Sequence, residues 1–160
     1  MRKINSELLI ICILIPIATG SFSSLLSGSG MAAFEQMNKP ALSPPGIAFP
    51  IVWTILYILM GIASYLVLTS SADAALIRPA IIFYGLQLAV NFFWSIFFFR
   101  FEWYLFSFIW LLLLWGLIWV CIVLFDRISK TAAWLMVPYL LWVTFAGYLN
   151  LSIYLLNRSA

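Results

Sequence analysis

Five stretches of about twenty residues each contain no Asp, Glu, Lys or Arg and consist mostly of apolar side chains, and they constrain this sequence more than any other feature. A helix needs roughly 20 such residues to cross the hydrocarbon core of a membrane. Across the 160 residues, 66% are hydrophobic and 8% are charged, which a soluble domain of this size could not bury. We therefore predict an all-α membrane protein, a single domain over residues 1–160 with transmembrane helices at about 8–26, 47–68, 79–99, 103–125 and 132–156.

The first stretch has a second interpretation from its residues alone. Arg2 and Lys3 precede the apolar run, and the small residues at 18–20 follow it, as in a cleaved signal peptide. The run continues past these positions to Leu26, which is long for a signal peptide. A retained helix and a removed leader are both compatible with this segment.

The segment at 27–46 is the one long connection, and it contains Pro40, Pro44 and Pro45. Proline fixes φ and stops helices, so we expect a partly rigid loop before the second membrane helix. Long loops in compact proteins are often functional. The loop is either a lid over a binding site or a passive connector.

Basic residues at the ends of the stretches predict the orientation in the membrane. Five lie on the amino-terminal side and three on the other, and the positive-inside rule then favours a cytoplasmic amino terminus. The net charge of +3 is too small and scattered to indicate nucleic-acid binding, so no nucleic-acid partner is expected. The five basic residues on the amino-terminal side are Arg2, Lys3, Arg78, Arg127 and Lys130, and the three on the other side are Lys39, Arg100 and Arg158.

Residues for common enzyme chemistry are scarce. The chain has no histidine, and Cys12 and Cys121 both lie within apolar runs, where structural thiols are expected. The sequence shows no nucleophile–base pair, phosphate loop or metal cluster. We predict no metal site and no required cofactor.

Aromatic and amide side chains recur at helical spacing on three of the stretches. One face of the third carries Gln87, Asn91 and Trp94, and faces of the second and fifth carry Trp53 with Tyr57, and Trp142 with Ala146, Leu149 and Asn150. Amides in hydrocarbon are costly unless paired, so these faces should point into the bundle. They either join helices by hydrogen bonds or line a pocket for a planar, apolar ligand that stacks on indole rings.

Two further patterns concern partners in the membrane. Gly85 and Ala89 form a small-xxx-small pair, which predicts a homodimer through the third helix. The segment from Leu151 to Arg158, which includes Tyr154, fits a loose sterol-contact pattern and equally an ordinary interfacial helix end.

Three sequence blocks resemble the translocator protein / tryptophan-rich sensory protein family, once called peripheral benzodiazepine receptors. Together they cover residues 39–150 in the family's order. The blocks are Lys39-Pro40, Ser43-Pro44-Pro45-Gly46 and Phe49 to Tyr57, continuing through Met60 to Val67; then Gln87-Leu88 and Asn91-Phe92-Phe93-Trp94-Ser95; then Val137 to Ala146 with Leu149-Asn150.

The resemblance implies a five-helix, usually dimeric bundle in a bacterial cell membrane, with its first helix retained and a ligand cavity opening toward the first loop. Members bind porphyrins such as protoporphyrin IX, and some bind sterols or drug-like ligands. By motif, Trp53, Trp142, Asn91, Trp94, Ala146 and Leu149 would line the cavity, and Pro44 and Pro45 would anchor the lid.

The leading hypothesis is therefore an integral membrane receptor or carrier for porphyrins and related hydrophobic ligands. A few bacterial members are proposed to degrade porphyrin in light, so the alternative is a photo-oxidative enzyme that uses Trp53 and Trp142, with porphyrin as the substrate. A structural membrane-assembly protein, whose amides only join helices, is the third hypothesis.

Overall fold

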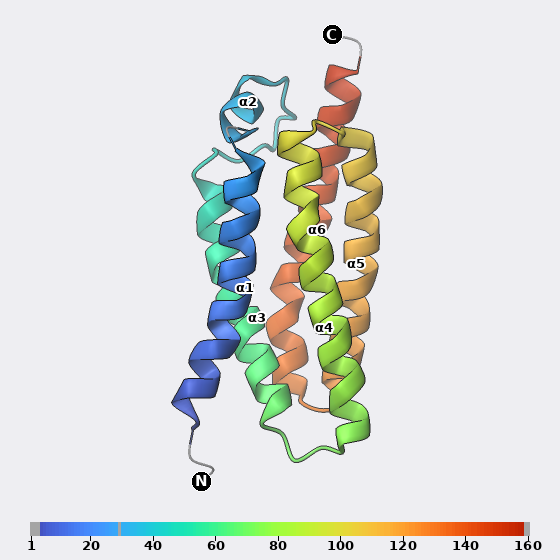
Figure 1. Cartoon of the computed structure of the whole chain (residues 1–160). Coiled ribbons are helices and arrows are strands. Elements are labelled where there is room, and N and C mark those ends of the chain that lie inside the picture. Colours follow the sequence, from blue (N-terminus) through green and yellow to red (C-terminus); the bar gives the residue numbers. More distant parts are fainter. Residues whose placement is uncertain (1–3, 29, 159–160) are drawn as a thin grey trace.

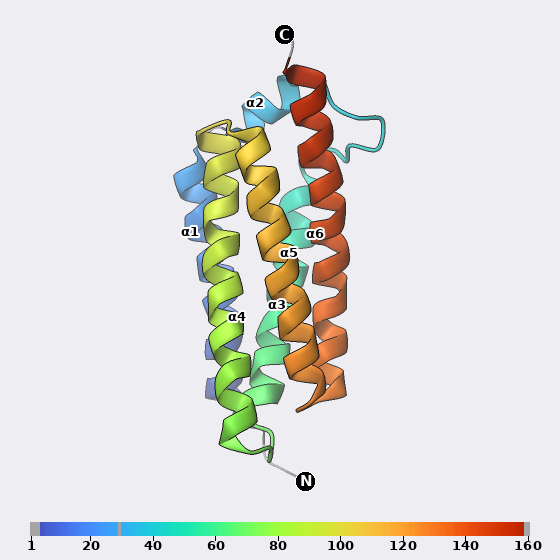
Figure 2. The ribbon, with the colours of Figure 1, turned by 90° about the vertical axis from the view of Figure 1, so that its right-hand side faces the viewer.

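The fold is a bundle of five long helices that run side by side (Figures 1 and 2). A computed structural model of the chain describes residues 4–28 and 30–158. The long helices are α1 (Ser6–Ser27), α3 (Ala48–Leu68), α4 (Ala74–Ser95), α5 (Tyr104–Asp126) and α6 (Lys130–Asn157). Two short elements complete the described chain: α2 (Gly30–Gln36) and the π-helical turn η1 (Ile96–Arg100), which extends α4.

Each long helix is apolar and long enough to cross a membrane. The shortest has 21 residues, which at about 1.5 Å per residue matches the roughly 30 Å hydrocarbon core. Large side chains such as Ile10, Phe22 and Ile109 are exposed on the outside of the bundle, as expected of a surface that faces lipid. The protein is an integral, multi-pass membrane protein.

Local capping signals set several helix ends. The Asn5 side chain accepts a hydrogen bond from the amide of Leu8, and Asp73 and Ser129 cap α4 and α6 in the same way. Such caps satisfy amide groups that have no partner inside the helix. These caps fix where α1, α4 and α6 begin, whereas α3 and α5 begin without a side-chain cap.

The helices form a closed ring in the order α1, α3, α6, α5, α4. The centre of the bundle is filled by side chains without any exposure, among them Met60, Leu114, Met136 and Tyr139. One end of the ring is covered by α2 and the segment that leads to α3 (Figure 1). The cavity between α1, α3 and α4 described below lies at this end.

Several boundaries differ from the sequence-based prediction. Helix α4 begins at Ala74 rather than at Pro79, because Asp73 caps it and the apolar criterion had excluded Arg78. The predicted loop at 27–46 contains the short helix α2, and the predicted third helix ends in the π-helical turn at 96–100. Arg2 and Lys3, which entered the topology prediction, lie outside the described residues.

Candidate functional site: a cavity between α1, α3 and α4

A cavity of about 800 Å³ lies between α1, α3 and α4, beneath α2. Small-molecule sites typically measure roughly 300–1,000 Å³ and have apolar walls with a few polar groups. The lining here has that character. It consists of Ile17, Gly20, Ser21, Ser23, Ser24, Leu25, Ser27, Gly28, Glu35, Gly46, Ile47, Phe49, Pro50, Trp53, Thr54, Tyr57, Asn91, Trp94, Ser95 and Phe99.

Aromatic rings from α3 and α4 form one wall of this cavity. Trp53 stacks on Tyr57 with ring centroids 5.4 Å apart, one helical turn along α3. The indole of Trp94 lies 6.4 Å from that of Trp53, and Trp94 stacks in turn on Phe98 at 5.6 Å. Rings in such contact hold one another in place, which gives the cavity one rigid aromatic wall.

Tyr57 joins the three helices that surround the cavity. Its hydroxyl accepts a hydrogen bond from Asn91 Nδ2 at 3.3 Å, linking α3 to α4. Its ring also lies against Gly20 of α1, so closely that a Cβ atom at position 20 would overlap it. A side chain other than glycine there would displace the ring and reshape the cavity.

Serine side chains of α1 also line the cavity, and the sequence analysis did not identify them. Ser23 donates to the carbonyl oxygen of Phe92 and also bonds to Ser95. Ser27 donates to the carbonyl of Ser23 at 2.8 Å and lies 2.9 Å from the Ser95 hydroxyl. The helical spacing of Gly20, Ser23 and Ser27 could have revealed this small, polar face.

Four of the predicted site residues meet at the cavity: Trp53, Tyr57, Asn91 and Trp94. Pro44 and Pro45 do not line it, although the turn that begins at Pro45 leads directly into α3. Trp142 lies behind Phe49, with ring centroids 6.0 Å apart. The predicted faces of the second and third membrane helices, α3 and α4, therefore line the cavity together with α1. The predicted face of the fifth membrane helix, α6, does not line it.

The remaining predicted residues are buried between helices, away from this cavity. Gln87 accepts a hydrogen bond from the Tyr139 hydroxyl at 2.9 Å, linking α4 to α6. Asn150 donates to Ser107 of α5 at 2.9 Å. Ala146 and Leu149 are 5% and 3% exposed. Gln87 and Asn150 therefore join helices by hydrogen bonds. This was the second interpretation of the amide side chains, beside contact with a ligand.

The proposed dimer residues lie on the outer surface of α4. Gly85 and Ala89 are both exposed, and a Cβ atom at Gly85 would meet nothing within 4 Å. The surface is thus open to another helix. The described structure is a single chain, so the homodimer stays a prediction.

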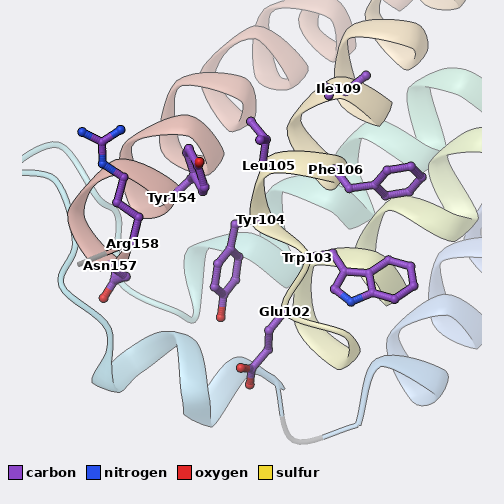
Figure 3. Close-up of a pocket in the computed structure, with 9 residues that line it drawn as sticks. All are labelled: Glu102, Trp103, Tyr104, Leu105, Phe106, Ile109, Tyr154, Asn157 and Arg158. Atoms are coloured by element: carbon purple, nitrogen blue, oxygen red, sulfur yellow. The ribbon is translucent and has the colours of Figure 1, made fainter. Parts of the chain in front are cut away.

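A second, open groove lies between the start of α5 and the end of α6 (Figure 3). Trp103 and Phe106 form one side of it, with ring centroids 5.9 Å apart. Tyr154, near the end of α6, and Arg158, which directly follows the helix, lie on the other side (Figure 3). Aromatic and basic side chains at a helix end are typical of the membrane interface.

Chemically, the cavity is suited to binding a flat, hydrophobic molecule. No group of His, Cys, Asp and Glu that could hold a metal ion occurs in residues 4–28 and 30–158. The cavity offers indole and phenol rings for stacking, and hydroxyl and amide groups for hydrogen bonds. These groups recognise a ligand by shape and polarity.

Comparison with known proteins agrees with this architecture. The model of the TspO/MBR family matches residues 12–156. The chain is 37% identical over 124 residues to the tryptophan-rich protein TspO of Chlorobaculum tepidum, covering 78% of each chain. It is 36% identical to the translocator protein homolog of Schizosaccharomyces pombe, covering 90% of this chain and 88% of the relative. With a match across almost its whole length, the chain belongs to the TspO/MBR family.

Proposed function

We propose that this protein binds a porphyrin, such as protoporphyrin IX, in the cavity between α1, α3 and α4, as a membrane receptor or carrier. One observation supports this most directly: Trp53, Tyr57, Asn91 and Trp94 line a single cavity of about 800 Å³. A porphyrin is planar and largely apolar, so it would stack on these rings. Related sterol or drug-like molecules would use the same surface.

A titration of the purified protein with protoporphyrin IX tests the proposal. Binding is followed in the dark by quenching of tryptophan fluorescence. We expect Trp53→Leu to weaken binding about tenfold, because stacking and burial of an aromatic surface are lost. Asn91→Leu should also weaken binding, since Tyr57 loses the hydrogen bond that holds it.

Trp119→Leu is the matched control. This tryptophan lies on α5, is 52% exposed and does not line the cavity. Its loss should leave the porphyrin affinity unchanged. If the Trp53 and Trp119 variants bind porphyrin equally well while melting at the wild-type temperature, the cavity is not the porphyrin site.

Photo-oxidative degradation is the second candidate function, favoured by the stack of Trp53 on Tyr57 in the cavity wall. Indole and phenol rings against a bound porphyrin are available electron donors when the porphyrin is excited by light. Illumination of the complex separates the two functions. Enzymatic breakdown requires a defined product that Trp53→Phe abolishes, whereas simple binding gives the same bleaching as porphyrin in empty detergent micelles.

A further inference from the structure

One side of the cavity lies at the outer wall of the bundle. Helices α1 and α3 are neighbours in the ring, and the cavity lies between the parts of them that are nearest α2. The lining residues on α4 are buried or half-buried, whereas several on α1 and α3 are exposed. The exposed lining residues of these two helices are Ser21, Ser24, Leu25, Pro50 and Thr54. The cavity is therefore open between α1 and α3 rather than toward α4.

Hydrogen bonds close the other gaps between the three helices. Ser23 of α1 bonds to Ser95 of α4, and Asn91 Nδ2 donates to the Tyr57 hydroxyl at 3.3 Å, which joins α4 to α3. Between α1 and α3, the ring of Tyr57 lies against Gly20. From Gly20 toward α2, no hydrogen bond or ring contact in the described chain joins α1 to α3. The opening thus extends from Gly20 to the end of the bundle.

This opening lies at the depth of the lipid chains. Helix α1 ends at Ser27 and α3 begins at Ala48, so Ser21 and Thr54 lie roughly 9 Å from these ends, at about 1.5 Å per residue. The two helices have 22 and 21 residues, little more than the roughly 20 that cross the hydrocarbon core. Acyl chains of the leaflet next to α2 therefore lie against the opening.

The end of the cavity beneath α2 is held by several contacts. Phe34 of α2 is 2% exposed, and its ring lies 5.3 Å from that of Phe49. Asn157, at the end of α6, donates from Nδ2 to the carbonyl oxygen of Asn38 at 3.0 Å and accepts from the Asn38 amide at 3.2 Å. A ligand that passed this end would have to break such contacts, whereas a ligand that passed between α1 and α3 would only displace fluid lipid.

From the open side and the held end, we infer that the ligand enters and leaves the cavity sideways, between α1 and α3, from the lipid leaflet next to α2. A porphyrin in that leaflet keeps its macrocycle among the acyl chains and its carboxylates at the water surface. Sideways entry preserves this orientation and brings the macrocycle to Trp53 and Trp94. The inference rests on the porphyrin-binding function proposed above, and it adds the route and the phase from which the ligand comes.

Filling the opening tests the route. Ser24→Phe places a ring in it, and Ala18→Phe is the matched control, because it adds the same ring at an exposed position of α1 outside the cavity lining. Protoporphyrin IX binding and release are timed by stopped-flow tryptophan fluorescence in phospholipid vesicles. We expect both rate constants of Ser24→Phe to fall about tenfold, since an obstacle on the path slows passage in both directions. Ala18→Phe should keep the wild-type rates.

A crosslink tests the other route. Asn38→Cys combined with Asn157→Cys, oxidised to a disulfide that mass spectrometry verifies, ties the segment before α3 to α6. Neither position lines the cavity. Because the oxidised and reduced forms carry the same substitutions, their comparison isolates the effect of the tie. We expect both forms to exchange porphyrin at the same rate.

The results against this route are specific. Wild-type rates in Ser24→Phe show that nothing passes between α1 and α3. Weaker binding in Ser24→Phe with an unchanged association rate makes Ser24 a ligand contact and not part of a passage. Slower exchange in the crosslinked form, restored by reduction, places the passage beneath α2. Each of these outcomes leaves porphyrin binding intact, whereas a wild type that porphyrin does not quench refutes the proposed function and this inference together.

Discussion

Buried amide side chains have two different roles in this bundle. Asn91 faces the ligand cavity and holds Tyr57 in place. Gln87, one helical turn earlier on the same helix, is fully buried and bonds to Tyr139 of α6. The two amides share a helical face, yet the ring of helices around them puts only one at the cavity. Stability and binding should therefore respond separately to substitutions at the two positions.

Tyr139→Phe should destabilise the fold without changing porphyrin affinity. The substitution keeps the ring that packs against Trp53 but leaves Gln87 Oε1 buried without its donor. We expect the free energy of unfolding to fall by about 1–2 kcal/mol, measured by thermal denaturation in detergent. Tyr148→Phe, at an exposed position, should have no such effect.

The double variant Gln87→Leu with Tyr139→Phe tests the cause. Replacing both partners by apolar groups leaves no polar atom unsatisfied, so most of the lost stability should return. A double variant that is less stable than Tyr139→Phe alone would contradict this explanation. A loss of porphyrin affinity in Tyr139→Phe would instead assign this pair to the binding site.

At the level of single residues, the sequence identified which side chains face inward but not what each one meets. Helical spacing correctly turned Gln87, Asn91 and Asn150 toward the interior, because an exposed amide in lipid is costly. Spacing within one helix cannot tell which neighbouring helix a side chain faces. That depends on the order of the helices around the ring, which brings α1, and not α6, to the cavity.

At the level of elements, α1 and α3 are in close backbone contact. Gly61 of α3 is buried, and a Cβ atom there would lie 2.5 Å from the Cα atom of Ile13 and 2.7 Å from the carbonyl oxygen of Cys12. Small residues that let backbones approach are a usual means of helix association in membranes. The contact fixes α1 against α3 and so sets the width of the cavity.

Gly61→Ala should loosen this packing. The added methyl group meets the backbone of α1, which cannot move aside as a flexible side chain would. We expect a loss of about 1–3 kcal/mol in stability and weaker porphyrin binding, measured by thermal denaturation and by fluorescence titration. Gly116→Ala is the control, since a Cβ atom there meets nothing within 4 Å. Equal melting temperatures for the two variants would show that the close contact is unimportant.

The five membrane helices were predictable because length and polarity nearly determine them, whereas the smaller elements were not. Helix α2 has seven residues, too few for a recognisable apolar pattern. The π-helical turn η1 continues an apolar run without any change in composition. Helix α2 and η1 each contribute a residue to the cavity lining, so the two elements that the sequence did not predict are both part of the site.

On the scale of the whole molecule, the outer face of α4 is the candidate surface for a second copy of the chain. Gly85→Leu and Ala89→Leu should fill the open surface there and block close helix approach. We expect these variants to remain folded and to shift from dimer to monomer, measured by native mass spectrometry or crosslinking in membranes. Ile109→Leu, on the exposed face of α5, should leave the oligomeric state unchanged.

If Gly85→Leu and Ala89→Leu leave the fraction of dimer unchanged, this surface is not the interface. If wild type itself is monomeric in the membrane, the predicted homodimer is wrong altogether. Neither result would affect the cavity, because its lining includes no residue of this outer surface.

The orientation of the bundle in the membrane follows from charges at its two ends, and cysteine labelling in intact cells can test it. The two native cysteines are buried and should not react. Ala41 and Ser71 are exposed in connections at opposite ends of the bundle. With a cytoplasmic amino terminus, Ala41→Cys should react with a membrane-impermeant maleimide, and Ser71→Cys only after the cells are permeabilised. The reverse pattern would place the amino terminus outside the cell and the end of the bundle that α2 covers in the cytoplasm. Neutralising Arg78, Arg127 and Lys130 leaves two basic residues at that end against three at the other, so mixed labelling of both cysteines is then expected.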